Sequence, residues 1–157
     1  MNNLNNTYSL HPQLTADTHK LGQLTLSDVL LMDSTELPWV ILVPRIRSAR
    51  EWHDLSAENQ IQLHQESMLI GQTLMNLFGG DKLNTGAIGN MVPQLHIHHI
   101  VRFTTDSVWP KPVWGNIENE CYSAKELAII SDKVVKQLRA GSSSFIACQA
   151  RRATITK

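Results

Sequence analysis

The sequence predicts an α+β fold with a mostly antiparallel sheet, because strand-like and helix-like patterns occur in separate stretches of the chain. Apolar or partly alternating stretches predict strands, and two stretches with the period of a helix lie between and after them. The order is therefore strands, a long helix, strands and a C-terminal helix. The length of 157 residues fits a single domain, 1–157, with its core at about 14–115.

The first two predicted strands lie close together in the sequence. Residues 23–33, QLTLSDVLLMD, partly alternate between polar and apolar, which is typical of a half-buried strand. Residues 38–45, PWVILVPR, are a short apolar run rich in Val and Ile, which favours a buried strand. The short connection between them predicts an antiparallel pair.

The long helix is predicted by its caps and by its apolar period. Ser56 is a good N-cap, and Gly79-Gly80 can end the helix. Ile61, Met68 and Met75 recur at intervals of seven residues, and the neighbouring stripe is filled by Leu63, Ile70, Leu74 and Leu77. This pattern predicts an amphipathic helix with a wide buried face.

The second half of the chain predicts two more strands and the C-terminal helix. Residues 82–90 are expected to be a strand that runs into a glycine loop, and residues 92–103 a further strand. Ser123 and Glu126 form an S-x-x-E capping box that predicts a helix over 123–139. The tail, 141–157, has no clear period and could be flexible, and the polar first dozen residues are expected to be loosely held.

Composition excludes several classes of protein. Hydrophobic residues make up 42% and charged residues 18%, which is typical of a globular domain. A formal net charge of zero argues against a broad basic surface for nucleic acid or an anionic membrane. Two cysteines are too few for a disulfide framework, and no apolar run approaches the roughly 20 residues of a membrane span. We therefore expect a soluble, cytoplasmic protein.

The segment Gln94 to His99, QLHIHH, is the most informative in the chain. If it is a strand, Gln94, His96 and His98 point to one face, and Leu95, Ile97 and His99 point to the other. Three nitrogen-bearing side chains on one face are costly to bury, so this pattern indicates a site. Gly86 and Gly89 lie in the preceding loop, where backbone N–H groups can approach an anion such as phosphate.

Three interpretations of the histidines are open. They can be structural and satisfied by hydrogen bonds. His96 and His98 can also chelate zinc with a distant partner, the other candidates being His11, His19, His53 and His64, although the chain has no H-E-x-x-H helix. The third interpretation is nucleophilic catalysis by an imidazole.

Gln94-Leu-His96-Ile-His98-His99 resembles the histidine-triad (HIT) motif, His-φ-His-φ-His-φ-φ, with glutamine in the first triad position. The resemblance extends to three other segments: LLMDSTELPWVILVPR (30–45), LNTGAIGNMVPQLHIH (83–98) and VWPKPVWG (108–115), the last of which is similar to bacterial members. It implies a HIT-like fold with a five-stranded sheet, one long helix and a C-terminal helix.

The resemblance also implies roles for individual residues. His96 matches the nucleophile, which forms a nucleotidyl-imidazole intermediate, and His98 matches the third histidine, which helps to hold the phosphate. Gln94 stands at the first triad position. For nucleotide binding, the resemblance points to Asn84, Gly89 and Asp33, of which Asp33 matches an acidic residue that contacts the ribose.

The resulting hypothesis is a metal-independent nucleotide phosphate hydrolase or nucleotidyl transferase without a cofactor, and a homodimer. Expected substrates are dinucleoside polyphosphates or nucleoside phosphoramidates. Gln94 supports an alternative, because an amide cannot act as an acid at neutral pH. Met91 also stands where some phosphoramidate-cleaving relatives have a serine. The alternative is a nucleotide-binding or interaction protein with a degenerate triad and little turnover.

Overall fold

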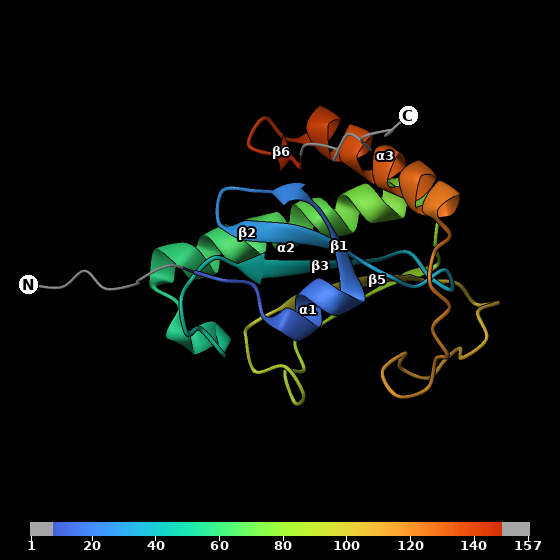
Figure 1. The fold of residues 1–157 in the computed structure, drawn as a ribbon, viewed down its shortest axis with the longest axis horizontal. Coiled ribbons are helices and arrows are strands. Elements are labelled where there is room, and N and C mark those ends of the chain that lie inside the picture. Colours follow the sequence, from blue (N-terminus) through green and yellow to red (C-terminus); the bar gives the residue numbers. More distant parts are fainter. Residues whose placement is uncertain (1–7, 149–157) are drawn as a thin grey trace, which may run out of the picture.

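The computed structural model describes residues 8–148 and shows one antiparallel sheet with its helices (Figure 1). The strand order in the sheet is β4-β5-β3-β2-β1-β6. The strands are β1 (Thr18–Gln23), β2 (Ser27–Met32), β3 (Trp39–Pro44), β4 (Lys82–Gly86), β5 (Ile97–Arg102) and β6 (Ile146–Ala147). The helices are α1 (Pro12–Asp17), the 3₁₀ turn η1 (Trp52–Asp54), α2 (Ala57–Phe78) and α3 (Ala124–Gly141).

The two faces of the sheet pack against different parts of the chain. We call one the helix face: its residues Val29, Leu31, Val40, Leu42, Ile97 and Val101 share a core with buried residues of α2 and α3. We call the other the site face, with the residues Leu30, Trp39, Ile41, Val43 and Ile100. The site face packs instead against the N-terminal segment and the long loop between β5 and α3, which extends away from the sheet in Figure 1. Side chains that alternate along β5 therefore meet two distinct environments.

Helix α2 has the predicted caps and only part of the predicted buried face. The Ser56 side chain accepts a hydrogen bond from Asn59 N, and Gly79 ends the helix in the left-handed region with φ of 63°. Ile61 and Met68, which the seven-residue interval placed on the buried face, are 61% and 56% exposed. Leu63, Ile70 and Leu74 of the neighbouring stripe are buried as predicted, together with Glu66, Gly71 and Thr73. Leu63 and Ile70 are also seven residues apart, so the exposed and buried residues differ in the stripe they occupy and not in their interval.

The predicted α+β fold class with a mostly antiparallel sheet is confirmed, but the sheet has six strands and not five. The sixth strand, β6, pairs with β1 through Gly22 and Ala147, inside the segment expected to be a tail. The predicted strand at 23–33 is the end of β1, a turn and β2, which form a hairpin. Residues 8–12 are held by helix α1 and by hydrogen bonds and are not loose as expected. Residues 1–7 lie outside the described residues. The remaining tail, 149–157, lies outside the described residues.

No helix among residues 8–148 has both the length and the hydropathy that a membrane span requires.

Candidate active site

The predicted strand at 92–103 forms a regular strand only from Ile97, so Gln94 and His96 precede β5. Pro93 has no N–H to donate to a ladder, and Leu95 N donates to Ala49 O at 2.9 Å instead of to a neighbouring strand. The chain therefore bends just before β5. His96 and His98 still lie together, with ring centroids 4.8 Å apart and an interplanar angle of 72°.

The imidazole of His96 is fixed by the backbone two residues earlier. His96 Nδ1 lies 2.6 Å from the carbonyl oxygen of Gln94. A carbonyl can only accept a hydrogen bond, so Nδ1 carries a proton, and in the neutral ring Nε2 keeps its lone pair. His96 is buried, with 7% of the residue exposed, so little solvent competes for this contact. The local geometry thus leaves His96 Nε2 as a potential nucleophile.

His98 lies on the site face inside an aromatic enclosure. Its ring makes edge contacts with Trp39 at 5.5 Å and with Trp114 at 5.6 Å between centroids. Burial, together with the charges that His96 and His99 can carry, lowers the pKa of His98 to about 3. His98 is therefore a neutral imidazole at pH 7.

The side chain of Gln94 holds the N-terminal segment. Gln94 Oε1 accepts a hydrogen bond from His11 N at 2.8 Å, and Gln94 Nε2 donates to Ser9 O at 2.9 Å. Tyr8 continues the attachment, because its hydroxyl donates to Asp28 Oδ2 in β2 at 3.1 Å. Gln94 thus contacts His96 through its carbonyl and residues 9–11 through its amide.

The glycine loop and the segment before η1 form a small cavity beside His96. The cavity has a volume of about 40 Å³, and its lining includes Gly89, Gln94, His96 and the exposed residue Arg50. Gly89 has φ of 65°, a conformation that favours glycine. The structure therefore brings Gly89 to His96, as expected, and adds a cation that the sequence analysis did not single out.

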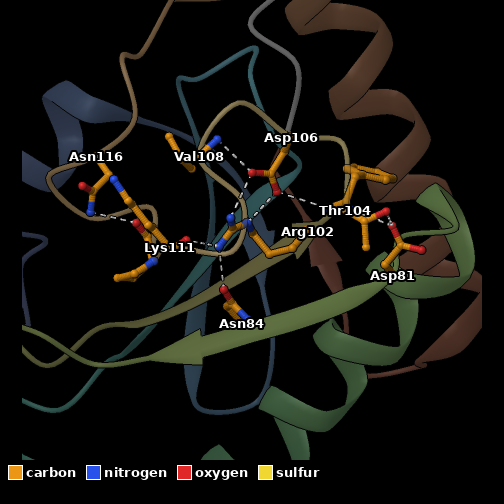
Figure 2. Close-up of polar contacts among 10 residues, drawn as sticks. Asp81, Asn84, Arg102, Thr104, Asp106, Val108, Lys111 and Asn116 are labelled. Carbon is orange, nitrogen blue, oxygen red and sulfur yellow. Dashed lines mark hydrogen bonds and ion pairs between the residues drawn. The ribbon is translucent and has the colours of Figure 1, made fainter.

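Asn84 lies on β4 opposite Ile100, and its side chain is engaged by a buried arginine (Figure 2). Arg102 NH1 donates to Asn84 Oδ1 and to Lys111 O, both at 2.9 Å. Arg102 also donates from Nε and NH2 to the two carboxylate oxygens of Asp106, at 2.8 and 2.9 Å. The Arg102 guanidinium holds the pKa of Asp106 below its usual range. We call these four residues the Arg102 network; it ties β4 and β5 to the loop that carries Trp114.

The structure does not bring Asp33 to the histidines. Asp33 follows the end of β2, and β3 lies between β2 and β5. Leu30 of β2 pairs with Ile41 of β3, which in turn pairs with His98 of β5. Strand spacings put the Asp33 and His98 Cα atoms on the order of 14 Å apart. The Asp33 carboxylate accepts from Tyr122 N at 2.9 Å and lies 3.4 Å from His19 Nε2. Burial acts to raise its pKa, but the hydrogen bonds outweigh this and lower it.

The remaining histidines do not join His96 and His98. His99 points to the helix face, as expected, and lies 2.6 Å from Ser67 Oγ of α2. His11 caps α1, accepting from Gln13 N at 3.1 Å, and His19 faces Asp33. Among residues 8–148 no three His, Cys, Asp or Glu side chains gather in a way that could hold a metal ion.

Comparison with known proteins identifies the family. The profile of the HIT domain matches residues 13–105. The chain belongs to the histidine triad family. A histidine triad protein from Marinobacter aquaeolei VT8 is 48% identical, with a TM-score of 0.84 over 87% of this chain and 99% of that one. One from Bradyrhizobium japonicum is 39% identical, with a TM-score of 0.82 over 84% and 98% of the two chains.

A third structure, of a HIT protein from Sinorhizobium meliloti 1021, is 34% identical, with a TM-score of 0.81 over 83% of this chain and 97% of that one. No curated protein is similar enough to count as a relative. These matches confirm the HIT-like fold, and HIT membership suggests nucleotide binding with hydrolase or transferase activity. The triad roles of Gln94, His96 and His98 stay a prediction.

Two residues that lie beside the histidines, Trp39 and Arg50, were missed in the sequence. Trp39 stood out only as part of an apolar strand, and its place beside His98 depends on the register between β3 and β5. Arg50 is separated from His96 by the whole of α2 and β4, so no local spacing links the two. The Leu95 N to Ala49 O hydrogen bond, which a single sequence does not predict, joins these segments.

Proposed function

We propose that this HIT protein is a nucleotide phosphate hydrolase or nucleotidyl transferase that works through a covalent intermediate on His96. The observation that supports the proposal most is the hydrogen bond from His96 Nδ1 to Gln94 O at 2.6 Å. It orients the ring, directs the lone pair of Nε2 outward, and stabilises the positive charge that the ring gains on attack.

The reaction has two displacements at phosphorus. In the first, the Nε2 lone pair of His96 forms an N–P bond to the nucleotide phosphate, and the leaving group departs with the electrons of its own bond to phosphorus. In the second, water attacks the same phosphorus and loses a proton to the departed leaving group or to solvent. The N–P bond breaks, and its electrons return to Nε2. The products are a nucleoside monophosphate and free imidazole, so His96 is regenerated; a transferase would use another nucleophile in place of water.

The phosphate oxygens need hydrogen-bond donors during both displacements. The proposal assigns this role to His98, to backbone N–H groups around Gly89, and to Arg50 at the same cavity. Gln94 takes part through its carbonyl. The assignment of Asn84 and Asp33 to nucleotide binding stays a prediction, since Asn84 Oδ1 is engaged by Arg102 and Asp33 lies apart from the histidines.

Dinucleoside polyphosphates and nucleoside phosphoramidates are the substrates proposed, and the protein is proposed to act as a cytoplasmic homodimer. Both substrate classes present a nucleotide phosphate with a leaving group on phosphorus. They differ in how strongly the leaving group needs a proton. Met91 is 92% exposed and its thioether has no proton to give, so this side chain does not supply an acid.

One observation favours the alternative, a nucleotide-binding HIT protein with little turnover. Both amide atoms of Gln94 are occupied by Ser9 and His11, and an amide has no acidic proton to pass to a leaving group. If a leaving group must be protonated from the first triad position, this side chain cannot do it.

Trapping the covalent intermediate decides between the proposed enzyme and a nucleotide-binding protein with little turnover. The protein is mixed with a dinucleoside polyphosphate or a nucleoside phosphoramidate, quenched in denaturant at alkaline pH to preserve the P–N bond, and weighed by intact-mass spectrometry. We expect a nucleotidyl adduct on the wild type and on His64→Ala, a matched surface variant, and none on His96→Asn. An equal adduct on His96→Asn would refute the assignment. Saturable nucleotide binding without any adduct would favour the alternative.

A further inference from the structure

Trp39 donates its indole N–H to the imidazole of His98. The distance from Trp39 Nε1 to His98 Nδ1 is 2.9 Å, and both residues are buried, at 4% and 8% exposed. The contact follows from strand register. Trp39 pairs with Ile100 and Ile41 pairs with His98, so Trp39 is the diagonal neighbour of His98 on the site face. Diagonal pairs lie within reach of a large aromatic side chain.

This hydrogen bond determines which nitrogen of His98 carries the proton. An indole nitrogen is only a donor, so His98 Nδ1 must be the acceptor. The low pKa of His98, about 3, leaves a single ring proton at neutral pH. That proton is therefore on Nε2. The titratable groups whose charges act on His98 are its neighbours His96 and His99.

We propose that Trp39 is a positioning residue that holds His98 in the Nε2–H tautomer, so that His98 donates a hydrogen bond to a phosphate oxygen beside His96. The inference rests on the proposed function for the phosphate, and on the Trp39–His98 hydrogen bond for the tautomer. It gives the two histidines opposite tautomers, with Nε2 of His96 as nucleophile and Nε2–H of His98 as donor.

Trp114 provides a matched control for Trp39. Its ring lies 5.6 Å from that of His98, nearly the same as the 5.5 Å of Trp39. The indole N–H of Trp114, however, is buried without a hydrogen-bond partner among residues 8–148. A Cβ atom on Gly86 would lie 3.0 Å from Trp114 Cη2, so β4 packs closely against the ring. Both tryptophans enclose His98, but only Trp39 donates to it.

The tautomer can be measured directly by ¹⁵N NMR of histidine ring nitrogens in the wild-type protein, with His98→Asn used for assignment. We expect His98 to show a protonated Nε2 and an unprotonated Nδ1 at pH 7. Trp39→Phe removes the donor and keeps an aromatic ring, so His98 should gain the Nδ1–H tautomer. Trp114→Phe should leave the wild-type tautomer unchanged. Wild-type His98 protonated at Nδ1 would overturn the proposal, even if Trp39→Phe failed to fold.

Kinetics then separate a positioning role from simple packing. We expect Trp39→Phe to lower kcat at least about tenfold, towards the 10²–10³-fold loss typical of removing one oxyanion donor, with a smaller change in KM. Trp114→Phe should lose less. A folded Trp39→Phe protein with wild-type kcat would overturn the proposal. Failure to trap an adduct on wild-type protein would reject the proposed function, whereas the NMR result would still report what Trp39 does to His98.

Discussion

Removing the guanidinium of Arg102 should strongly lower the free energy of unfolding of the protein. Arg102 is 1% exposed and makes four hydrogen bonds, two of them to the Asp106 carboxylate, whose side chain is 5% exposed. Arg102→Met fills similar space but leaves Asp106 as an unpaired buried charge. Breaking such a pair from one side costs about 3–5 kcal/mol, a large fraction of the roughly 5–15 kcal/mol of a typical domain.

The assay is urea denaturation at pH 7 and low temperature, monitored by circular dichroism. Arg139→Met is the control, because Arg139 is exposed in the last turn of α3 and its loss should cost only a few tenths of a kcal/mol. Arg102→Lys should fall between the two, since an ammonium keeps the charge but cannot form the planar fork. If Arg102→Met lay within about 1 kcal/mol of wild type, the Arg102 network would be worth no more than a surface ion pair, and the reasoning would be refuted.

Four further predictions concern the histidine site and the assembly. Gln94→His should lower the rate for good and poor leaving groups alike, because the amide already holds Ser9 and His11; a gain limited to poor leaving groups would show that an acid is needed there. Burial lowers the pKa values of His98 and His99 from 6.5 to about 3 and about 4, so the unfolded chain binds more protons between those values and 6.5. Stability should therefore be full above pH 6.5 and fall on acidification by up to about 1.4 kcal/mol per pH unit for each histidine; a flat urea midpoint from pH 7 to 5 would contradict this. Arg50→Ala should raise KM about tenfold with a smaller effect on kcat, measured by steady-state kinetics, and an unchanged KM would remove Arg50 from the phosphate site. Light scattering should give twice the monomer mass of 17.7 kDa at micromolar concentrations, and the monomer mass would refute the homodimer.

Helix ends and buried strands could be predicted from the sequence because their signals are local. Ser56, Gly79 and the Ser123–Glu126 box act within one helical turn, and all of them cap as expected. The apolar run of β3 needed no partner to be recognised. By contrast, β6 has two residues and exists because β1 offers it a neighbour, which is a tertiary cause.

The candidate site was predictable as far as strand alternation reaches. Alternation correctly paired His96 with His98 and sent His99 to the helix face. Alternation could not show that the regular strand begins only at Ile97, after Pro93. It also could not show that the backbone carbonyl of Gln94, and not its side-chain amide, contacts His96. Trp39 depended on register between strands, and Arg50 on a loop contact across the fold, so neither had a local signal.

The double engagement of Gln94 has a practical consequence for how the chain can be handled. The same residue orients the His96 ring through its carbonyl, accepts a hydrogen bond from His11 N and donates one to Ser9 O. An expression variant that starts at Pro12, or a bulky fusion close to Tyr8, would remove or strain the partners of the Gln94 amide, and the released side chain would no longer restrain its own carbonyl. Changes at the amino terminus, far from the histidines in sequence, therefore act on the orientation of the His96 ring, and kinetic constants should be compared only between proteins with the same N-terminus.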